Sequence, residues 1–258
     1  MSDKRLEDKV CIVTGSTAGI GEAIAELFAE QGGKVVVSGR RPEKGEQVAR
    51  RICDRGHTAV FQQCDVMNDA QMDALVADTV ERFGGLDVLV NNAADVPGAH
   101  GPNRDVELLP VDDWESQINT NLRSVYYLSK LAIPLMRQRG GGAIVNVSSV
   151  GSIVGWPKGA AYLASKGAIN QLSLSMAIDY MRDNIRVNTL CPGWIRSETE
   201  AARVNEDPTI VENLFERKGI TRMGEPREMA FPALFLACDE SSYVTGTALF
   251  ADGGWTLQ

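Results

Sequence analysis

The sequence predicts an α/β fold: a single-domain, doubly wound parallel sheet of about seven strands with helices on both faces. Short β-branched runs alternate along the chain with longer amphipathic stretches. The short runs are apolar throughout, which is typical of parallel strands covered by helices on each side. The 258 residues suit one large domain, and no linker, repeat or low-complexity tract divides them. Right-handed crossovers between such strands lead to a doubly wound sheet.

The elements follow from these runs in chain order. The expected strands are 10–14, 34–38, 58–62, 88–91, 143–148, 186–190 and 248–251. The expected helices lie near 19–31, 43–55, 69–83, 112–139, 160–182 and 225–237. The run Gly140-Gly141-Gly142 indicates a helix end before the fifth strand.

One polar segment, near 194–218, interrupts the alternation after the sixth strand. Asp207-Pro208 has the character of an N-cap and first helical turn, and apolar residues follow it at helical spacing. A small helix inserted after a strand end predicts a lid over a ligand site. A plain helical hairpin on the surface is the alternative.

Charge and composition exclude several functions. The formal net charge is -8 and the pI about 4.9, which argues against nucleic-acid binding and against an acidic carrier-protein partner. Five cysteines without a CxxC motif indicate free thiols in a reducing compartment. The two histidines share no motif, so no metal site is expected. The first apolar run, 10–13, is too short for a signal peptide or membrane span, and we expect a cytoplasmic protein with no membrane association.

A glycine-rich turn joins the first strand to the first helix. It reads Thr14-Gly15-Ser16-Thr17-Ala18-Gly19-Ile20-Gly21. Glycines let the backbone turn tightly and approach a pyrophosphate, and the helix N-terminus behind them offers free N–H groups. Many strand-to-helix turns carry glycines, but this one lies at the end of the first strand and therefore predicts nucleotide binding.

The Gly-x-x-x-Gly-x-Gly spacing resembles that of the short-chain dehydrogenase/reductase family, and the likeness extends from about residue 8 to 254. Asn91-Asn92-Ala93-Ala94 departs from the family's Asn-Asn-Ala-Gly only in its last residue, and Asp252-Gly253-Gly254 resembles the family's last strand ending. The resemblance implies a Rossmann-type fold, an acid at Asp65 that meets the adenine amino group, and a turn at Pro192-Gly193 that borders the nicotinamide. The expected cofactor-binding residues are Gly15, Ser16, Thr17, Gly19, Ile20, Gly21, Arg40, Arg41, Asp65, Val66, Asn92, Ala93, Ala94, Tyr162, Lys166, Pro192, Gly193 and Ile195.

The end of the second strand bears on the choice of cofactor. Enzymes that use NAD usually place an acid there to accept from the ribose 2′-OH, whereas this chain has Gly39 followed by Arg40 and Arg41. A guanidinium suits a 2′-phosphate, so NADP(H) is favoured over NAD(H). Two features keep NAD open: both arginines could be solvated loop cations, and Ala18 stands where family members that bind NADP more clearly have a basic residue.

Tyr162 and Lys166 are the expected proton-transfer pair. They are four residues apart in a helical stretch and so share a face, and a nearby ammonium favours the phenolate of a group whose pKa is otherwise near 10. Alone, the pair could be an ordinary surface pair. The family resemblance adds Ser149, preferred to Ser148, as the group that hydrogen-bonds the substrate oxygen. It also adds Asn121, preferred to Asn119 because Leu122 follows it, as the group that holds a water beside the lysine.

These four residues predict an NAD(P)-dependent alcohol dehydrogenase or carbonyl reductase acting on a secondary alcohol or ketone. The substrate pocket is expected to contain Ser149, Val96, Trp156 and Trp194. The two tryptophans suggest an apolar or ring-bearing substrate, or else they pack a lid against the core.

Two other functions stay open, a 3-oxoacyl-thioester reductase and a dinucleotide-sensing regulator. The acidic balance counts against the first, and the complete set of four residues against the second. The helices near 112–139 and 160–182 resemble those at the family's subunit interfaces, so we expect a homotetramer, with a dimer as the alternative.

Overall fold

A computed structural model describes residues 4–96, 104–197, 200 and 222–257. Its centre is a 7-stranded sheet in the order β3-β2-β1-β4-β5-β6-β7, with every neighbouring pair parallel. The prediction of a doubly wound parallel sheet is therefore confirmed. The strands are β1 (Val10–Thr14), β2 (Lys34–Gly39), β3 (Thr58–Gln63), β4 (Val88–Asn91), β5 (Gly142–Val147), β6 (Ile185–Pro192) and β7 (Ala248–Ala251).

The strand bounds differ from the expected ones by two residues at most, and β6 differs most. It begins one residue early because Ile185 pairs with Gly142, and it continues to Pro192, which pairs with Ala251. The N–H of Gly193 then donates to the carbonyl of Ala251. The extra pairing carries β6 up to the turn that was predicted to border the nicotinamide.

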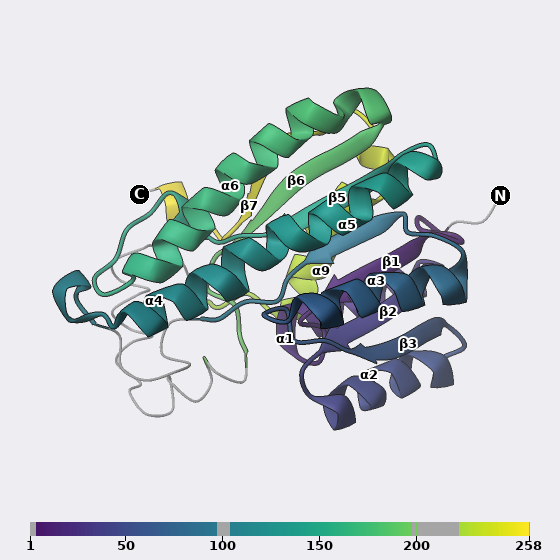
Figure 1. Ribbon diagram of the computed structural model, residues 1–258, viewed down its shortest axis with the longest axis horizontal. Coiled ribbons are helices and arrows are strands. Elements are labelled where there is room, and N and C mark those ends of the chain that lie inside the picture. The colour runs from purple at the N-terminus through teal and green to yellow at the C-terminus, as the bar shows by residue number, and fades with distance from the viewer. Residues whose placement is uncertain (1–3, 97–103, 198–199, 201–221, 258) are drawn as a thin grey trace.

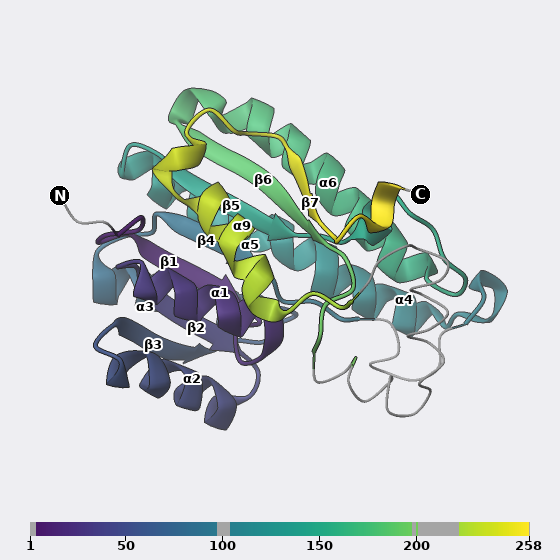
Figure 2. The same cartoon turned by 180° about the vertical axis from the view of Figure 1, so that it is seen from behind.

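Helices cover both faces of the sheet (Figures 1 and 2). One face carries α1 (Gly19–Glu30), α2 (Pro42–Asp54) and α9 (Pro226–Ala237). The other carries α3 (Asp69–Phe83), α5 (Ser124–Gln138) and α6 (Ala160–Tyr180). Successive strand residues enter opposite cores, as with Ile12 on the side of α3 and α5 and Val13 on the side of α1 and α9. Burial on both faces explains why the strands are apolar throughout.

The stretch expected as one helix near 112–139 has three parts. It comprises α4 (Val111–Ile118), a π-helical turn (Asn119–Arg123) and α5. The helix expected near 112–139 is therefore present and runs from Val111 to Gln138, but it contains a π-helical turn that hydrophobic periodicity does not indicate. The end of α5 matches the expectation, since Gly140 and Gly141 have φ values of 82° and 144°.

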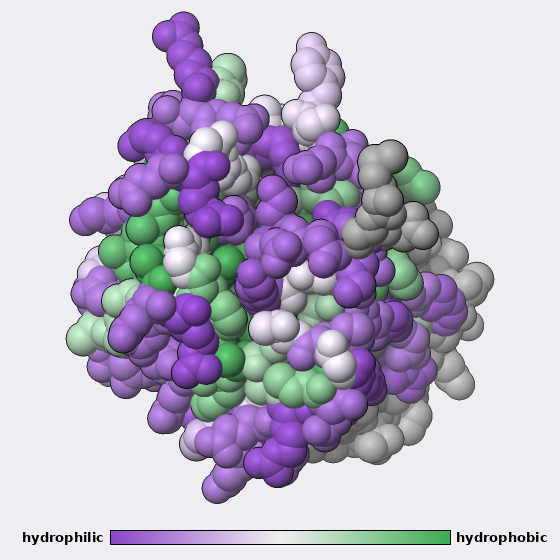
Figure 3. Space-filling view, turned by 90° about the vertical axis from the view of Figure 1, so that its right-hand side faces the viewer, coloured by the Kyte–Doolittle hydropathy of each residue, from purple (hydrophilic) through white to green (hydrophobic). Residues whose placement is uncertain are grey.

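The segment after β6, the protein surface and the charged side chains bear on the other expectations from the sequence. Most of the segment near 194–218, including the small helix expected as a lid, lies outside the described residues. The face at the amino ends of the strands is mostly hydrophilic, with apolar patches between polar side chains (Figure 3). Among the described residues, no helix is long and apolar enough to cross a membrane. Nor do three or more His, Cys, Asp or Glu side chains gather there as a metal site would require.

Candidate active site

The predicted site residues follow the carboxyl ends of β1, β4, β5 and β6. In a parallel sheet these ends lie along one edge, and the chain reverses its direction of winding between β1 and β4. Ligands of open α/β sheets bind in the crevice at such a reversal. The glycine loop after β1, Asn92 after β4, Ser149 after β5 and Gly193 after β6 therefore lie along this one edge of the sheet.

The glycine loop has the geometry of an anion cradle. Gly15 has φ of 63°, and a Cβ there would lie 2.7 Å from Ala93 Cα. Gly19 has φ of 61° and open space where a side chain would be. Ala18, the N-cap of α1, supplies no side-chain cap, whereas Asn68 caps α3 by accepting from the Gln71 N–H. The uncapped first turn of α1 leaves N–H groups for an anion such as a dinucleotide pyrophosphate.

Two of the residues expected to contact the cofactor hold this loop in place. The Ser16 hydroxyl donates to the Val13 carbonyl at 2.6 Å and accepts from the Ser38 N–H at 2.9 Å. The Asn92 side chain donates to the carbonyls of Thr14 and Gly15 at 2.9 and 3.1 Å. Their side chains thus fix the position of the backbone, and direct contact with a cofactor stays a prediction.

The end of β2 lies beside the same loop. A Cβ at Gly39 would lie 2.7 Å from Thr17 Cγ2, so an acidic side chain has no room there unless Thr17 moves. The Arg41 guanidinium donates to Thr17 Oγ1 at 3.1 Å, while Arg40 is exposed. Asp65 follows β3, and one of its carboxylate oxygens accepts the Met67 N–H at 3.0 Å. This edge therefore carries two guanidinium groups where an NAD enzyme would carry an acid.

Tyr162 and Lys166 lie on one face of α6, as their spacing predicts. The Lys166 ammonium is 5.6 Å from the centre of the Tyr162 ring and donates to the Val147 carbonyl at 3.0 Å. Lys166 is 2% exposed, and burial lowers its pKa to about 8. The Ser148 hydroxyl donates to the Lys166 carbonyl at 2.9 Å, so the serine that was not selected supports the helix that carries the pair.

The Tyr162 phenol responds mainly to its burial, which raises its pKa. A hydrogen bond with Ser149 opposes that shift, and the negative charge of Glu200 adds to it. The sequence predicted that Lys166 lowers the pKa of Tyr162, whereas burial raises it. The Lys166 ammonium donates to the Val147 carbonyl and lies 5.6 Å from the centre of the Tyr162 ring.

Asn121 joins three elements of the site. It is fully buried in the π-helical turn, and its carbonyl oxygen accepts the Asp95 N–H at 2.6 Å. Its amide donates to the Asp95 carbonyl and to the Ser165 hydroxyl, which in turn donates to the Tyr162 carbonyl. The side chain is thus engaged with the loop after β4 and with α6, and its expected hold on a water stays a prediction.

Of the residues expected to line the substrate pocket, Trp156 contacts Tyr162. The Trp156 ring centre is 6.0 Å from that of Tyr162, at an interplanar angle of 38°. The Trp194 indole N–H donates to Glu200 Oε2 at 2.6 Å. Val96 is half-buried at the last described position of the loop after β4.

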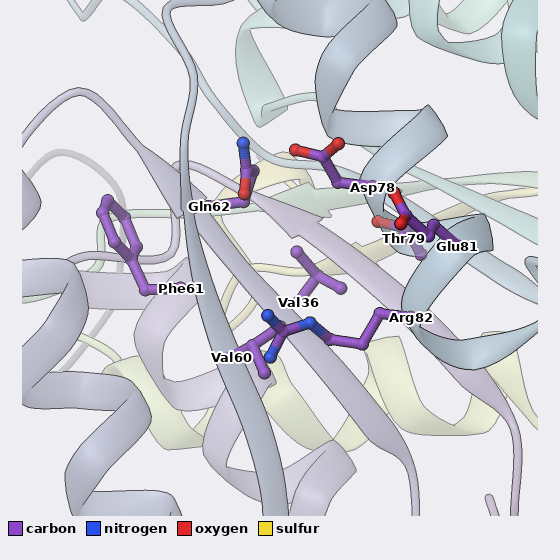
Figure 4. A pocket seen from close by; sticks show the side chains of 8 residues that line it. All are labelled: Val36, Val60, Phe61, Gln62, Asp78, Thr79, Glu81 and Arg82. Atoms are coloured by element: carbon purple, nitrogen blue, oxygen red, sulfur yellow. The ribbon is translucent and has the colours of Figure 1, made fainter.

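A separate hollow of about 380 Å³ lies between β2, β3 and α3 (Figure 4). Its lining includes Val36, Val60, Asp78 and Arg82, and none of the predicted site residues. Exposed charged groups surround it, and no catalytic combination of side chains converges on it. We therefore place the candidate site at the strand ends.

A family model described as enoyl-(acyl carrier protein) reductase matches residues 15–256. Curated relatives in the short-chain dehydrogenase/reductase family match almost the whole chain. The chain belongs to the short-chain dehydrogenase/reductase family.

Three family members show the range of its relatives. The NADP-dependent (R)-specific alcohol dehydrogenase of Lentilactobacillus kefiri is 38% identical, over 98% of this chain and 99% of its own. The 3β-hydroxysteroid dehydrogenase of Mediterraneibacter gnavus is 37% identical, over 98% and 96%. The crystal structure of a gluconate 5-dehydrogenase from Burkholderia cenocepacia, in complex with NADP and tartrate, superposes with a TM-score of 0.91 at 34% identity, over 98% and 97%.

The structure of this short-chain dehydrogenase/reductase places three further residues, Thr14, Val147 and Glu200, in contact with the predicted site residues. Thr14 Oγ1 accepts the N–H groups of Asn92 and Ala93 at 3.0 Å each, which ties β1 to the loop after β4. Val147 acts through its main-chain carbonyl, which leaves no trace in residue type. Glu200 lies in a polar segment without regular spacing, so nothing in the sequence pointed to it.

Proposed function

We propose that the protein is an NADP(H)-dependent oxidoreductase that interconverts a secondary alcohol and a ketone, with Tyr162 as the proton-transfer group. The observation that carries the proposal is the buried Lys166 ammonium over the Tyr162 ring, with Ser149 hydrogen-bonded to the phenol, at the strand ends that flank the glycine cradle. Alcohol and hydroxysteroid dehydrogenases among the relatives support the reaction class.

The residues would divide the reaction as follows. A bound nicotinamide dinucleotide would supply the hydride chemistry at the carbinol or carbonyl carbon, and the protein's own residues would handle the proton. In reduction, the Tyr162 hydroxyl donates its proton to the carbonyl oxygen, and in oxidation the Tyr162 phenolate removes the proton of the alcohol. Ser149 donates to the same substrate oxygen and stabilises the charge that develops there. The raised pKa of Tyr162 favours its proton-donating form.

The glycine loop and the strand ends would hold the dinucleotide. The uncapped turn of α1 faces the pyrophosphate, Asp65 and Val66 border the adenine, and Pro192, Gly193 and Ile195 border the nicotinamide. Arg40 and Arg41 would bind the 2′-phosphate, and the crowding between Gly39 and Thr17 supports this choice because it disfavours an acid there.

Turnover of reduced nicotinamide with a panel of ketones tests the proposal. We expect oxidation of NADPH with at least one ketone, and a higher kcat/KM for NADPH than for NADH. Arg40→Ala should lower kcat/KM for NADPH about tenfold and leave NADH unchanged, because a guanidinium–phosphate contact is lost. Arg50→Ala removes an exposed charge on α2 and is the matched control. Failure with both cofactors on every ketone would favour the dinucleotide-sensing regulator.

A 3-oxoacyl-thioester reductase is the second candidate, because the matching family model is described by a reductase that acts on acyl thioesters, although on an enoyl group and not on a 3-oxo group. The net charge of -8 counts against docking of an acidic carrier protein. A 3-oxoacyl thioester in the same ketone panel separates the two, since turnover of that thioester alone would favour the second.

We further propose a homotetramer in a reducing, cytoplasmic compartment. Large apolar side chains on the surfaces of α4, α5, α6 and α9 support association: Val111, Tyr126, Ile178 and Phe231 are 68, 50, 67 and 51% exposed. All five cysteines are free, which supports the compartment. Sedimentation equilibrium tests the association; a monomer would contradict it, and a dimer would leave only one interface in use.

A further inference from the structure

Two indole rings are tied to the surroundings of Tyr162 by different means. Trp156 is fixed by the backbone, because glycines at 151 and 159 leave room for its ring: a Cβ at Gly151 would lie 2.5 Å from Trp156 Cη2 and one at Gly159 2.7 Å from Nε1. Its ring then lies 6.0 Å from the ring of Tyr162. Trp156 therefore forms an aromatic surface beside Tyr162 that is packed closely against the backbone at Gly151 and Gly159.

Trp194 is held by a side chain instead. It lies directly after the Pro192-Gly193 turn, and its indole N–H donates to Glu200 Oε2 at 2.6 Å. Glu200 is itself anchored, because its N–H donates to the Ser197 hydroxyl at 3.1 Å. A carboxylate acceptor makes a stronger hydrogen bond than a neutral one, and the bond fixes the rotation of the indole.

Glu200 also lies near the reacting group. Its negative charge acts on the Tyr162 phenol and raises the pKa of that group. Trp194 follows the carboxyl end of β6, and Ser149, which bonds the phenol, follows the carboxyl end of the neighbouring strand β5, so both indoles belong to the edge of the sheet that carries Tyr162.

We propose that Glu200 is a positioning residue that sets substrate specificity by fixing the Trp194 indole as a second aromatic wall, so that the site prefers ketones and alcohols whose reacting carbon belongs to a ring. The inference rests on the proposed function. Flat walls with fixed orientation contact a cyclic skeleton without the loss of rotational freedom that an open chain incurs. The role requires only that Glu200 accepts from Trp194, whatever else its carboxylate contacts.

The test compares an alicyclic ketone with its open-chain counterpart, cyclohexanone against 2-hexanone, with NADPH. The unmodified protein should favour cyclohexanone in kcat/KM by about tenfold. Glu200→Ala should remove this preference, mainly through a higher KM for cyclohexanone, with little change in KM for 2-hexanone. Glu200→Gln keeps an acceptor for the indole N–H and should retain the preference.

The controls separate orientation from charge and from folding. Glu46→Gln removes one exposed acid on α2 and should change neither ketone. Three outcomes would each overturn the inference while leaving the oxidoreductase proposal intact. They are a preference of the unmodified protein for 2-hexanone, a preference for cyclohexanone that persists in Glu200→Ala, and a Glu200→Gln variant that behaves like Glu200→Ala. If neither ketone nor any other carbonyl is turned over, the proposed function itself fails.

Discussion

Replacing Asn121 by alanine tests how the π-helical turn supports the site. The Asn121 side chain makes three hydrogen bonds, two to the backbone of Asp95 and one to the Ser165 hydroxyl. Because the side chain is fully buried, water cannot replace these partners. The variant leaves the Asp95 N–H and carbonyl without their partner and frees the loop after β4.

The magnitude follows from these three bonds. Each contributes about 1 kcal/mol net, and buried groups left without partners add about 1–3 kcal/mol. We therefore expect Asn121→Ala to lower the free energy of unfolding by about 4–6 kcal/mol, which corresponds to a fall in Tm of roughly 10–20 °C for a chain of this length. We also expect kcat to fall at least tenfold, because Ser165 links Asn121 to the carbonyl of Tyr162.

Thermal unfolding and steady-state kinetics measure both effects. Asn119→Ala is the matched control, since it lies in the same π-helical turn, is half-buried, and has no side-chain hydrogen bond among the described residues. It should lower Tm by only a few degrees and leave kcat within about twofold. Equal losses in the two variants, or an Asn121→Ala variant as stable and active as the unmodified protein, would refute the reasoning.

Three further predictions concern other parts of the chain. The pKa of Lys166 is lowered from 10.5 to about 8 in the folded protein, so between pH 8 and 10.5 the unfolded state binds more protons than the folded state. In denaturant titrations, the free energy of unfolding relative to Lys166→Met should therefore rise from pH 8 to 10.5. The same pH dependence in both proteins would contradict this. The Arg186 guanidinium donates to the main-chain carbonyls at the end of α9. Arg186→Met should therefore lower the free energy of unfolding by about 3 kcal/mol and leave kcat/KM unchanged. A loss of activity without a loss of stability would count against this purely structural role. Gly15→Ala should weaken NADPH binding at least tenfold in fluorescence titration, because an added Cβ would collide with Ala93. Gly56→Ala is the control, since Gly56 also has a positive φ but faces open space, and it should leave the Kd unchanged. An unaltered Kd in Gly15→Ala would contradict the role of the glycine loop in binding the cofactor.

The sequence carried the fold and the candidate catalytic residues because both depend on local regularity. Apolar runs gave β1 and β4 to the residue, and the spacing of Tyr162 and Lys166 on one helix needed no tertiary information. The π-helical turn was not predicted, because hydrophobic periodicity does not distinguish it from α-helix, and the hydrogen bond between Asn121 and Asp95 joins residues distant in sequence.

The electrostatic balance of the site was equally out of reach. The effect of Lys166 on the pKa of Tyr162 depends on where its ammonium points. The ammonium donates to the main-chain carbonyl of Val147, and a main-chain partner cannot be identified from residue types. The contact between Trp194 and Glu200 is short in sequence, yet neither residue belongs to a periodic pattern. Substrate specificity was therefore the part that the sequence left most open.

The most direct test of the central claim is the rate of hydride transfer in Tyr162→Phe, measured in single turnovers with NADPH and a ketone that the unmodified protein reduces. Loss of the proton donor should slow the transfer by about 10³-fold while the Kd for NADPH stays within twofold. Tyr243→Phe, at a fully exposed position between α9 and β7, is the control and should change neither value. A Tyr162→Phe variant that transfers hydride within tenfold of the unmodified rate would contradict the assignment of Tyr162 as the proton-transfer group.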